Sequence, residues 1–462
     1  YDGTSRFPRG KRYGFFPSFS AAYRISEEAF FEPLRKTVDN LKIRLSYGSL
    51  GNQQIGYYDF IQTITTKGSM GDYSFDGTIL GQHATVSDPV SGNQTWEKVI
   101  SKNLGADLNM FSNRLSLTAD FYIRDTKGIL GKGKSLPSIY GANEPQVNSN
   151  NLRTKGYELV LVWRDSFKLA GSTFSYGITG TFSDYTAEYT KCDNPSGLIG
   201  DPYVGKKYGE IWGYKVDGLF RNDEEAAEYA SRVDLSKVAA GYYSATGAYG
   251  KGVRGGDIKY LDLDGSGIVD GGKGTLEDPG DRRVIGNSSP RYQYGLTLNL
   301  SWYGFDLSVF MQGIGRLDWY PGADNLRFWG PYSRPYATFI PKNFMSQVWS
   351  ESNPDAYLPR ARAYTSLNST QGTAYYTNDR YLQNLAYCRL KNLTLGYTIP
   401  KRLTSKVGIK ECRVYFSGEN LATWSALKND FLDPEQAAAD SDKKSNVYPW
   451  CRTYSVGLNL TF

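Results

Sequence analysis

Residues 452–462 read Arg-Thr-Tyr-Ser-Val-Gly-Leu-Asn-Leu-Thr-Phe, and this closing stretch decides the fold. Successive side chains of a β-strand point to opposite faces. One face is therefore small or polar, and the other carries the large apolar side chains of Tyr454, Val456, Leu458, Leu460 and Phe462. An edge strand with such a face in water would invite edge-to-edge association. Closing the sheet into a barrel removes the edge, so the stretch predicts a strand of a β-barrel.

The composition of the 462-residue chain favours one large barrel over several domains. Aromatic residues make up 15% of the chain, with 37 Tyr, and the 50 Gly favour tight turns over helices. No run of about 18 apolar residues occurs, so no transmembrane helix is predicted. A transmembrane β-strand needs only about 10 residues of alternating character, and the chain therefore remains a candidate membrane protein.

Charge and rare residues exclude several classes of function. The net charge of +6 is spread over interspersed charges of both signs, with no basic block that would bind nucleic acid. The four Cys lack C-x-x-C spacing and His83 is the single His. The chain therefore lacks the residues that a zinc site or a histidine-centred catalytic site needs. No spacing among the 47 Asp and Glu marks a glycosidase pair. We expect a protein that is not an enzyme and binds no nucleic acid.

The alternating pattern of the last strand recurs along the whole chain. Its clearest example is a hairpin in which residues 104–110 and 115–123 alternate on either side of a turn at Ser112 and Asn113. Asp120 falls on the polar face, where a water-filled or plugged lumen tolerates charge, and so does Arg124. We expect the apolar face to contact lipid through residues that include Leu115, Leu117, Phe121, Leu296, Leu298 and Leu458.

Short and long connections alternate between the expected strands. Short ones lie near 27–40, 112–113, 165–171, 303–304 and 400–410, and long ones occupy 51–94, 129–150, 192–288, 315–384 and 428–450. Outer-membrane barrels are built with short periplasmic turns and long extracellular loops. The short turns also carry aromatic residues, which fit a membrane-boundary girdle, although β-propensity alone accounts for any single one; they are Phe111, Trp302, Tyr303 and Phe305.

About eleven strands are expected, from a first strand at 12–25, followed by a short helical or turn segment at 27–39, to the last strand at 452–462. An even-numbered closed barrel cannot be made from eleven strands alone. We expect the first and last strands each to pair with a strand from outside this sequence, because open edges are not tolerated in hydrocarbon. The start, Tyr-Asp-Gly-Thr-Ser-Arg, has neither Met nor a signal segment, so we expect the C-terminal part of a longer protein.

Several short motifs together resemble a known family. They include Gly-Thr-Ser-Arg-Phe at 3–7, Leu-Ser-Tyr-Gly-Ser-Leu-Gly-Asn at 45–52, Gly-Asp-Ile-Lys-Tyr at 256–260, Asp-Pro-Glu at 433–435 and the closing strand. In consistent order over essentially the whole chain, they resemble the C-terminal barrel half of SusC/RagA-type TonB-dependent transporters.

The resemblance implies a nutrient importer of the Bacteroidetes outer membrane. Such a transporter takes up an oligosaccharide or peptide, works with a SusD-like surface lipoprotein that covers the barrel, and is coupled to TonB. Its barrel has about 22 strands, so the eleven here would be half of it. Residues 1–462 would then be one domain, the C-terminal part of the barrel, without the signal peptide, TonB box, plug and first barrel half.

Two other functions of different classes remain open at this stage. A passive outer-membrane porin would use the same barrel without energy coupling, and a plug and TonB box in the absent half would exclude it. A soluble glycan-binding β-protein or hydrolase would partition into the aqueous phase without detergent. Both rank below active import.

The long connection 192–288 contains a calcium-like motif. Oxygen ligands at loop positions 1, 3, 5, 7 and 9, with Gly at position 6, are what a Ca²⁺ loop needs. The predicted ligands are Asp262, Asp264, Ser266, the Ile268 carbonyl and Asp270. Because this connection has little apolar periodicity, we expect a structural cation to hold it in one shape for lid docking or substrate entry.

The closing acid of this motif is displaced, because Lys273 occupies position 12. The acids Glu277, Asp278 and Asp281 are each able to return and supply it. The resemblance favours Asp281, since in related sequences an Asp directly precedes residues like the Arg-Val-Ile-Gly found here at 283–286. The alternative is an Asp/Gly turn that binds no metal.

The long connection 315–384 concentrates five aromatic residues. Exposed aromatic clusters usually mark interfaces, so these rings are candidates for stacking on a sugar or anchoring the lid protein. The alternative is burial within the packing of the loop itself. The five residues are Trp319, Tyr320, Phe328, Trp329 and Tyr332.

Overall fold

The computed structural model describes residues 1–67, 74–75, 78–79, 83–134, 136–243, 252–333, 338, 340–362, 366–367, 372–429, 432–438 and 450–462. Within these ranges eleven long strands form one antiparallel sheet. They are β3 (Ser18–Arg24), β4 (Val38–Asn52), β9 (Glu97–Met110), β10 (Leu115–Lys132), β11 (Gln146–Leu169), β12 (Ser172–Lys191), β17 (Arg291–Trp302), β18 (Phe305–Arg316), β21 (Tyr387–Thr398), β22 (Glu411–Ser425) and β23 (Thr453–Thr461).

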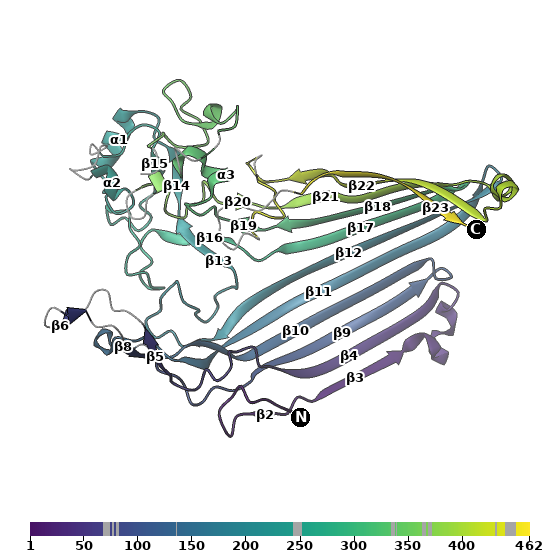
Figure 1. Cartoon of the computed structure of the whole chain (residues 1–462), viewed down its shortest axis with the longest axis horizontal. Coiled ribbons are helices and arrows are strands. Elements are labelled where there is room, and N and C mark those ends of the chain that lie inside the picture. Colours follow the sequence, from purple (N-terminus) through teal and green to yellow (C-terminus); the bar gives the residue numbers. More distant parts are fainter. Residues whose placement is uncertain are drawn as a thin grey trace.

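The order across the sheet is β23-β22-β21-β18-β17-β12-β11-β10-β9-β4-β3. Each strand pairs with its neighbour in the chain, as a meander does, so the predicted all-β fold with eleven strands is confirmed. β3 and β23 lie at opposite edges of the sheet and do not pair with each other (Figure 1). The sheet is therefore open within this chain, as half of a transmembrane barrel must be.

The start of the first strand differs from the prediction. Of residues 12–25, only Ser18–Arg24 joins the large sheet as β3, while β2 (Tyr13–Gly14) pairs with β1 (Asp2–Gly3). Pro17 lies between the two segments and has no N–H to donate, which explains the interruption. The segment after β3 forms two short 3₁₀ turns, η1 (Ile25–Glu27) and η2 (Ala29–Leu34).

The two ends of the sheet differ in the length of their connections, as the sequence predicted. Short turns join the strands at one end, and the long connections gather at the other (Figure 1). The short-turn end carries aromatic contacts between Phe111 and Trp163, with ring centroids 6.2 Å apart, and between Phe305 and Tyr397, at 4.5 Å. Trp302 donates a hydrogen bond from Nε1 to the Leu169 carbonyl, so the indole bridges neighbouring hairpins at this boundary.

The two faces of the sheet have different chemistry. Leu298 faces Ile178 and Val309 across the ladder, and this apolar set continues over the lipid-facing side. On the opposite face Arg44 bonds Asp107 at 2.9 Å and Asp120 at 2.8 Å. We call the first the apolar face and the second the polar face. Cross-strand ion pairs of this kind suit the polar interior of a barrel.

Changing Leu298 to Arg is expected to destabilise the barrel by about 2–4 kcal/mol, because the charge would lie near the bilayer midplane. Asn299→Arg is the matched control, since Asn299 lies beside Ser301 and Ser308 in a polar groove on the other face. Denaturant unfolding of the complete barrel in lipid vesicles measures both. Equal losses for the two variants would contradict the assignment of the faces.

The remaining elements lie mainly in the connections. Five small two-stranded sheets pair β5 (Ile64–Lys67) with β8 (His83–Val86), β6 (Ser74–Phe75) with β7 (Thr78–Ile79), β13 (Glu210–Tyr214) with β16 (Arg282–Asn287), β14 (Val216–Leu219) with β15 (Ile258–Tyr260) and β19 (Asp318–Trp319) with β20 (Gln383–Asn384) among the described residues. The helical segments are α1 (Asp223–Ala230), α2 (Ala240–Tyr243), α3 (Leu326–Trp329), α4 (Lys401–Thr404), η3 (Ser138–Tyr140), η4 (Gly330–Tyr332), η5 (Met345–Gln347) and η7 (Ser405–Val407). None of the helices in the described ranges is long and apolar enough to cross a membrane.

The main hydrophobic core lies outside the sheet, in the long connections. The described parts of 192–290 and 317–386 pack into one body, which we call the loop domain, at the long-connection end of the sheet (Figure 1). Phe220, Ile258, Tyr260 and Trp329 are fully buried in it. The connection 192–288 thus contributes to an apolar core although its sequence shows little apolar periodicity. Its core residues come singly from short strands, turns and helices, so they leave no periodic pattern in the sequence.

Candidate functional site

The calcium-like motif lies in the loop domain, between β15 and β16. It begins directly after β15, and its far end is fixed by a backbone hydrogen bond from Val269 N–H to the Asp234 carbonyl. Gly265 and Gly267 have φ values of 74° and 80°, which other residues rarely adopt. The chain therefore turns sharply at the two positions where the sequence supplies Gly.

Asp281, the acid that the resemblance favoured, lies beside the first two acids of the motif. Carboxylate oxygens of Asp262, Asp264 and Asp281 lie within 4.8 Å of one another. Asp281 is fully buried and accepts hydrogen bonds from the backbone N–H groups of Leu263, at 2.6 Å, and Asp270, at 2.9 Å. Burial raises the pKa of the Asp281 carboxyl, and these hydrogen bonds oppose the rise.

The other three predicted ligands are Ser266, the Ile268 carbonyl and Asp270, and each forms a hydrogen bond within the loop. The Ser266 hydroxyl donates to the Ile268 carbonyl at 3.0 Å, and one Asp270 carboxylate oxygen accepts from Gly272 N–H at 2.7 Å. Three of the six predicted ligands, the carboxylates of Asp262, Asp264 and Asp281, thus converge in this structure. Carboxylates are ligands that Ca²⁺ prefers, so the group of three fits the cation in chemistry and provides a partial first set of ligands.

The five candidate aromatic residues lie in the core of the loop domain or against it. Phe328, Trp329 and Tyr332 are buried, and Trp329 donates from Nε1 to the Pro321 carbonyl at 3.4 Å. Tyr320 donates its hydroxyl to the Tyr376 carbonyl at 3.0 Å. Because the buried rings have partners within the domain, their faces are not available to a sugar in this structure. Only Trp319 and Tyr320 keep partial exposure.

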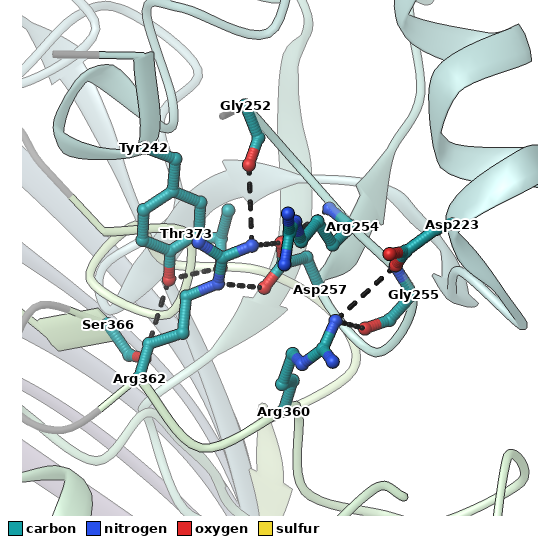
Figure 2. Close-up of polar contacts among 10 residues, drawn as sticks. All are labelled: Asp223, Tyr242, Gly252, Arg254, Gly255, Asp257, Arg360, Arg362, Ser366 and Thr373. Carbon is teal, nitrogen blue, oxygen red and sulfur yellow. Dashed lines mark hydrogen bonds and ion pairs between the residues drawn. The ribbon is translucent and has the colours of Figure 1, made fainter. Parts of the chain in front are cut away.

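A buried ion pair connects the two halves of the loop domain. Arg362 donates to Asp257 from Nε at 2.9 Å and from Nη2 at 2.6 Å, and both side chains are almost fully buried. Figure 2 shows the guanidinium between Asp257 and the ring of Tyr242, which lies 4.1 Å from it. Nη2 also donates to the Gly252 carbonyl at 3.3 Å.

Only one member of this ion pair stands out in the sequence. Asp257 belongs to the Gly-Asp-Ile-Lys-Tyr motif that contributed to the family resemblance, whereas Arg362 lies 105 residues further on. Burial raises the pKa of Asp257 to about 6, although Arg362 and the Arg254 backbone N–H favour its charged form. The pair fixes the segment before β15 to the segment that follows η5.

Curated relatives share similarity with this chain along its full length. TonB-dependent receptors P3 and P26 of Formosa agariphila are 27% and 28% identical to it, over 100% of this chain and 43% and 44% of theirs. The TonB-dependent receptor SusC of Bacteroides thetaiotaomicron is 22% identical, over 100% of this chain and 41% of its own. The chain thus spans less than half the length of these relatives. No family model matches it.

Solved structures share the fold. The RagAB peptide transporter aligns with a TM-score of 0.70 and 21% identity, over 99% of this chain and 44% of the matched chain. The open-open state of the RagAB peptide importer gives a TM-score of 0.68 over the same shares. Together with the sequence relatives, this identifies the eleven-stranded sheet as part of an outer-membrane β-barrel. By sequence, the chain is related throughout to SusC/RagA-type TonB-dependent receptors.

Proposed function

We propose that the chain is the C-terminal half of the barrel of an active importer, which carries an oligosaccharide or a peptide across the outer membrane. The observation that supports this most is the folded loop domain at the long-connection end of an open half-barrel with a charged polar face. A passive pore needs no separately packed domain at its mouth. The relatives named as TonB-dependent receptors favour energy coupling over a porin.

The proposed partners follow from the same arrangement. A SusD-like lipoprotein would dock on the loop domain and cover the barrel, and TonB would act through the N-terminal part of the full protein. The other half of the same barrel would supply strands for the exposed edges of β3 and β23. Import would involve no chemical change of the substrate, so no residue here is assigned a catalytic role.

Uptake by cells that carry the complete transporter is expected to fall to background when TonB is deleted. The reason is that a barrel closed by a plug would pass substrate only when TonB supplies the energy to open it. Radiolabelled oligosaccharide and peptide pools, tested separately, also identify the substrate class. Uptake that continues unchanged without TonB would favour the porin alternative.

We also propose that Asp262, Asp264 and Asp281 hold a structural Ca²⁺, with oxygens about 2.3–2.6 Å from the ion. Ser266, the Ile268 carbonyl and Asp270 would complete the shell by small rotations, since each lies in the same loop. The proposal is supported by the three converging carboxylates. Each of them also accepts backbone hydrogen bonds, so a metal-free turn is the alternative that the test must separate.

Asp264→Ala is expected to abolish the heat of Ca²⁺ binding to the complete transporter in isothermal titration. Asp264 is exposed, so its loss should leave the fold intact while it removes one of three carboxylates. Glu277→Ala is the control, because Glu277 is an exposed acid of the same loop outside the group. Identical heats for wild type and Asp264→Ala would mean that the motif is a turn without metal.

A further inference from the structure

Two lysines flank Ile123 on the apolar face of the sheet. Ile123 of β10 pairs with Lys102 of β9 on one side and with Lys155 of β11 on the other. All three therefore occupy one rung of the ladder and point to the same face. Neighbouring strands are about 4.8 Å apart, so the two lysines lie about 10 Å apart across Ile123.

An aromatic row runs directly beneath this rung. The ring centroids of Phe121 and Tyr157 are 6.3 Å apart, those of Tyr157 and Phe182 are 6.0 Å apart, and those of Phe182 and Tyr292 are 6.5 Å apart. These rings cross β10, β11, β12 and β17 at one level. Aromatic rows of this kind mark the membrane–water boundary of outer-membrane barrels.

The position along the strand agrees with that boundary. Ile123 follows Leu115, the residue at the short-turn end of β10, by eight residues. Eight residues span about 27 Å of strand, which a tilt of roughly 40° reduces to about 20 Å of height, close to the apolar band of such barrels, about 25 Å tall. Lys102 and Lys155 thus lie at the headgroup level of the leaflet on the long-connection side.

Two acidic side chains near this level are already paired with arginines. Arg291 bonds both carboxylate oxygens of Asp184 at 2.6 Å, and Arg153 bonds Asp125 at 2.6 Å. Within the described residues neither Lys102 nor Lys155 forms an ion pair, and both are exposed. Two cations without anions, fixed on rigid strands, are suited to a phosphate.

The same level carries a groove of about 680 Å³. Its apolar wall is formed by Leu45, Leu104 and Phe121, and its polar rim includes both lysines and the Asp184–Arg291 pair. We propose that this groove binds one anionic phosphorylated lipid of the outer leaflet. The lipid phosphate lies between Lys102 and Lys155, and an acyl chain runs over Leu45 and Leu104 toward the membrane centre.

Lipid binding by the complete transporter in detergent tests the inference, with phosphorylated lipid A as the probe and native mass spectrometry as the readout. Lys102→Gln/Lys155→Gln is expected to weaken binding by about thirtyfold, because each interfacial lysine contributes about 1 kcal/mol toward an anionic lipid. Lys42→Gln/Lys168→Gln is the charge-matched control. Lys42 lies on the polar face beside Asp107, and Lys168 lies near the short-turn end of β11.

Three outcomes would overturn the inference. One is an equal loss in both double variants, which would show that net charge alone attracts the lipid. Another is equal binding of dephosphorylated lipid A, which would leave the lysines without a role. The third is displacement of the lipid by inorganic phosphate at equal concentration, which would show that the lysines bind the free anion. A selective loss in Lys102→Gln/Lys155→Gln, confined to the phosphorylated probe, supports it.

Discussion

Replacing Arg362 by Met is expected to destabilise the loop domain by about 3–5 kcal/mol, because it leaves the Asp257 carboxylate buried without its partner. Both hydrogen bonds to that carboxylate would be lost, together with the contact between the guanidinium and Tyr242 (Figure 2). Hydrogen exchange at β15, which follows Asp257 directly, measures the local free energy of opening in the complete transporter. The double variant Asp257→Leu/Arg362→Met should recover much of the loss, since it leaves no buried charge.

Arg360→Met is the control for this prediction. Arg360 contacts Asp223 at 3.4 Å, and both side chains are partly exposed, so solvent screens the pair and the expected change is small. Exchange at β15 that is equally fast in Arg360→Met and Arg362→Met would contradict a special role for the buried pair.

The defect of Arg362→Met should shrink on acidification. Burial already raises the pKa of Asp257 to about 6 with Arg362 present, and removing that cation raises the pKa further. A carboxyl group whose pKa is higher in the folded state binds its proton preferentially when folded, so stability falls as pH rises through that pKa. The difference from wild type is therefore largest above about pH 6 and smallest near pH 4.

Trp329→Ala should cost about 3–5 kcal/mol of loop-domain stability, because it opens a cavity in the core. Trp329 is fully buried, with its ring centroid 5.1 Å from that of Tyr381 and 4.7 Å from that of Phe328. Exchange at α3 and β20 should rise together, while substrate affinity of the fraction that stays folded should not change.

Trp424→Ala is the matched comparison, since Trp424 of β22 is 57% exposed and lies outside this core. If Trp329→Ala weakened substrate binding while exchange in the loop domain stayed at the wild-type level, the residue would be a contact residue instead of a core residue. The alternative in which the five aromatic residues form a binding surface would then be favoured.

Strand periodicity made the barrel predictable from sequence. Apolar and polar side chains alternate along each strand, and Leu115, Leu117 and Phe121 show this alternation within a single strand. The eleven strands, their antiparallel order and the alternation of short and long connections follow from that rule. It fails at Pro17, where a missing donor ends the pairing that the pattern of Phe15 and Phe19 suggested.

The loop domain was not predictable in the same way. Its core residues, such as Phe220, Val238 and Leu358, occur without period and meet only in three dimensions. Arg362 finds Asp257 across 105 residues, and no local pattern connects them. Asp281 was favoured only through family resemblance, because nothing in the spacing distinguishes it from Asp278. The exposed or buried state of Trp329 likewise depends on partners from distant segments.

The loop domain also has a consequence for assembly. Its two main segments leave the sheet between β12 and β17 and between β18 and β21, so they meet only when those four strands stand in their native order. We therefore expect contacts such as that between Tyr242 and Thr373, 131 residues apart, to form late, after strand pairing has offset the entropy cost of closing the long loops. A slip of one residue in that register would turn every side chain to the other face and displace the halves. A folded loop domain therefore indicates that the strands have paired in their native register. An antibody that binds only the folded surface of this domain would detect only barrels with that register.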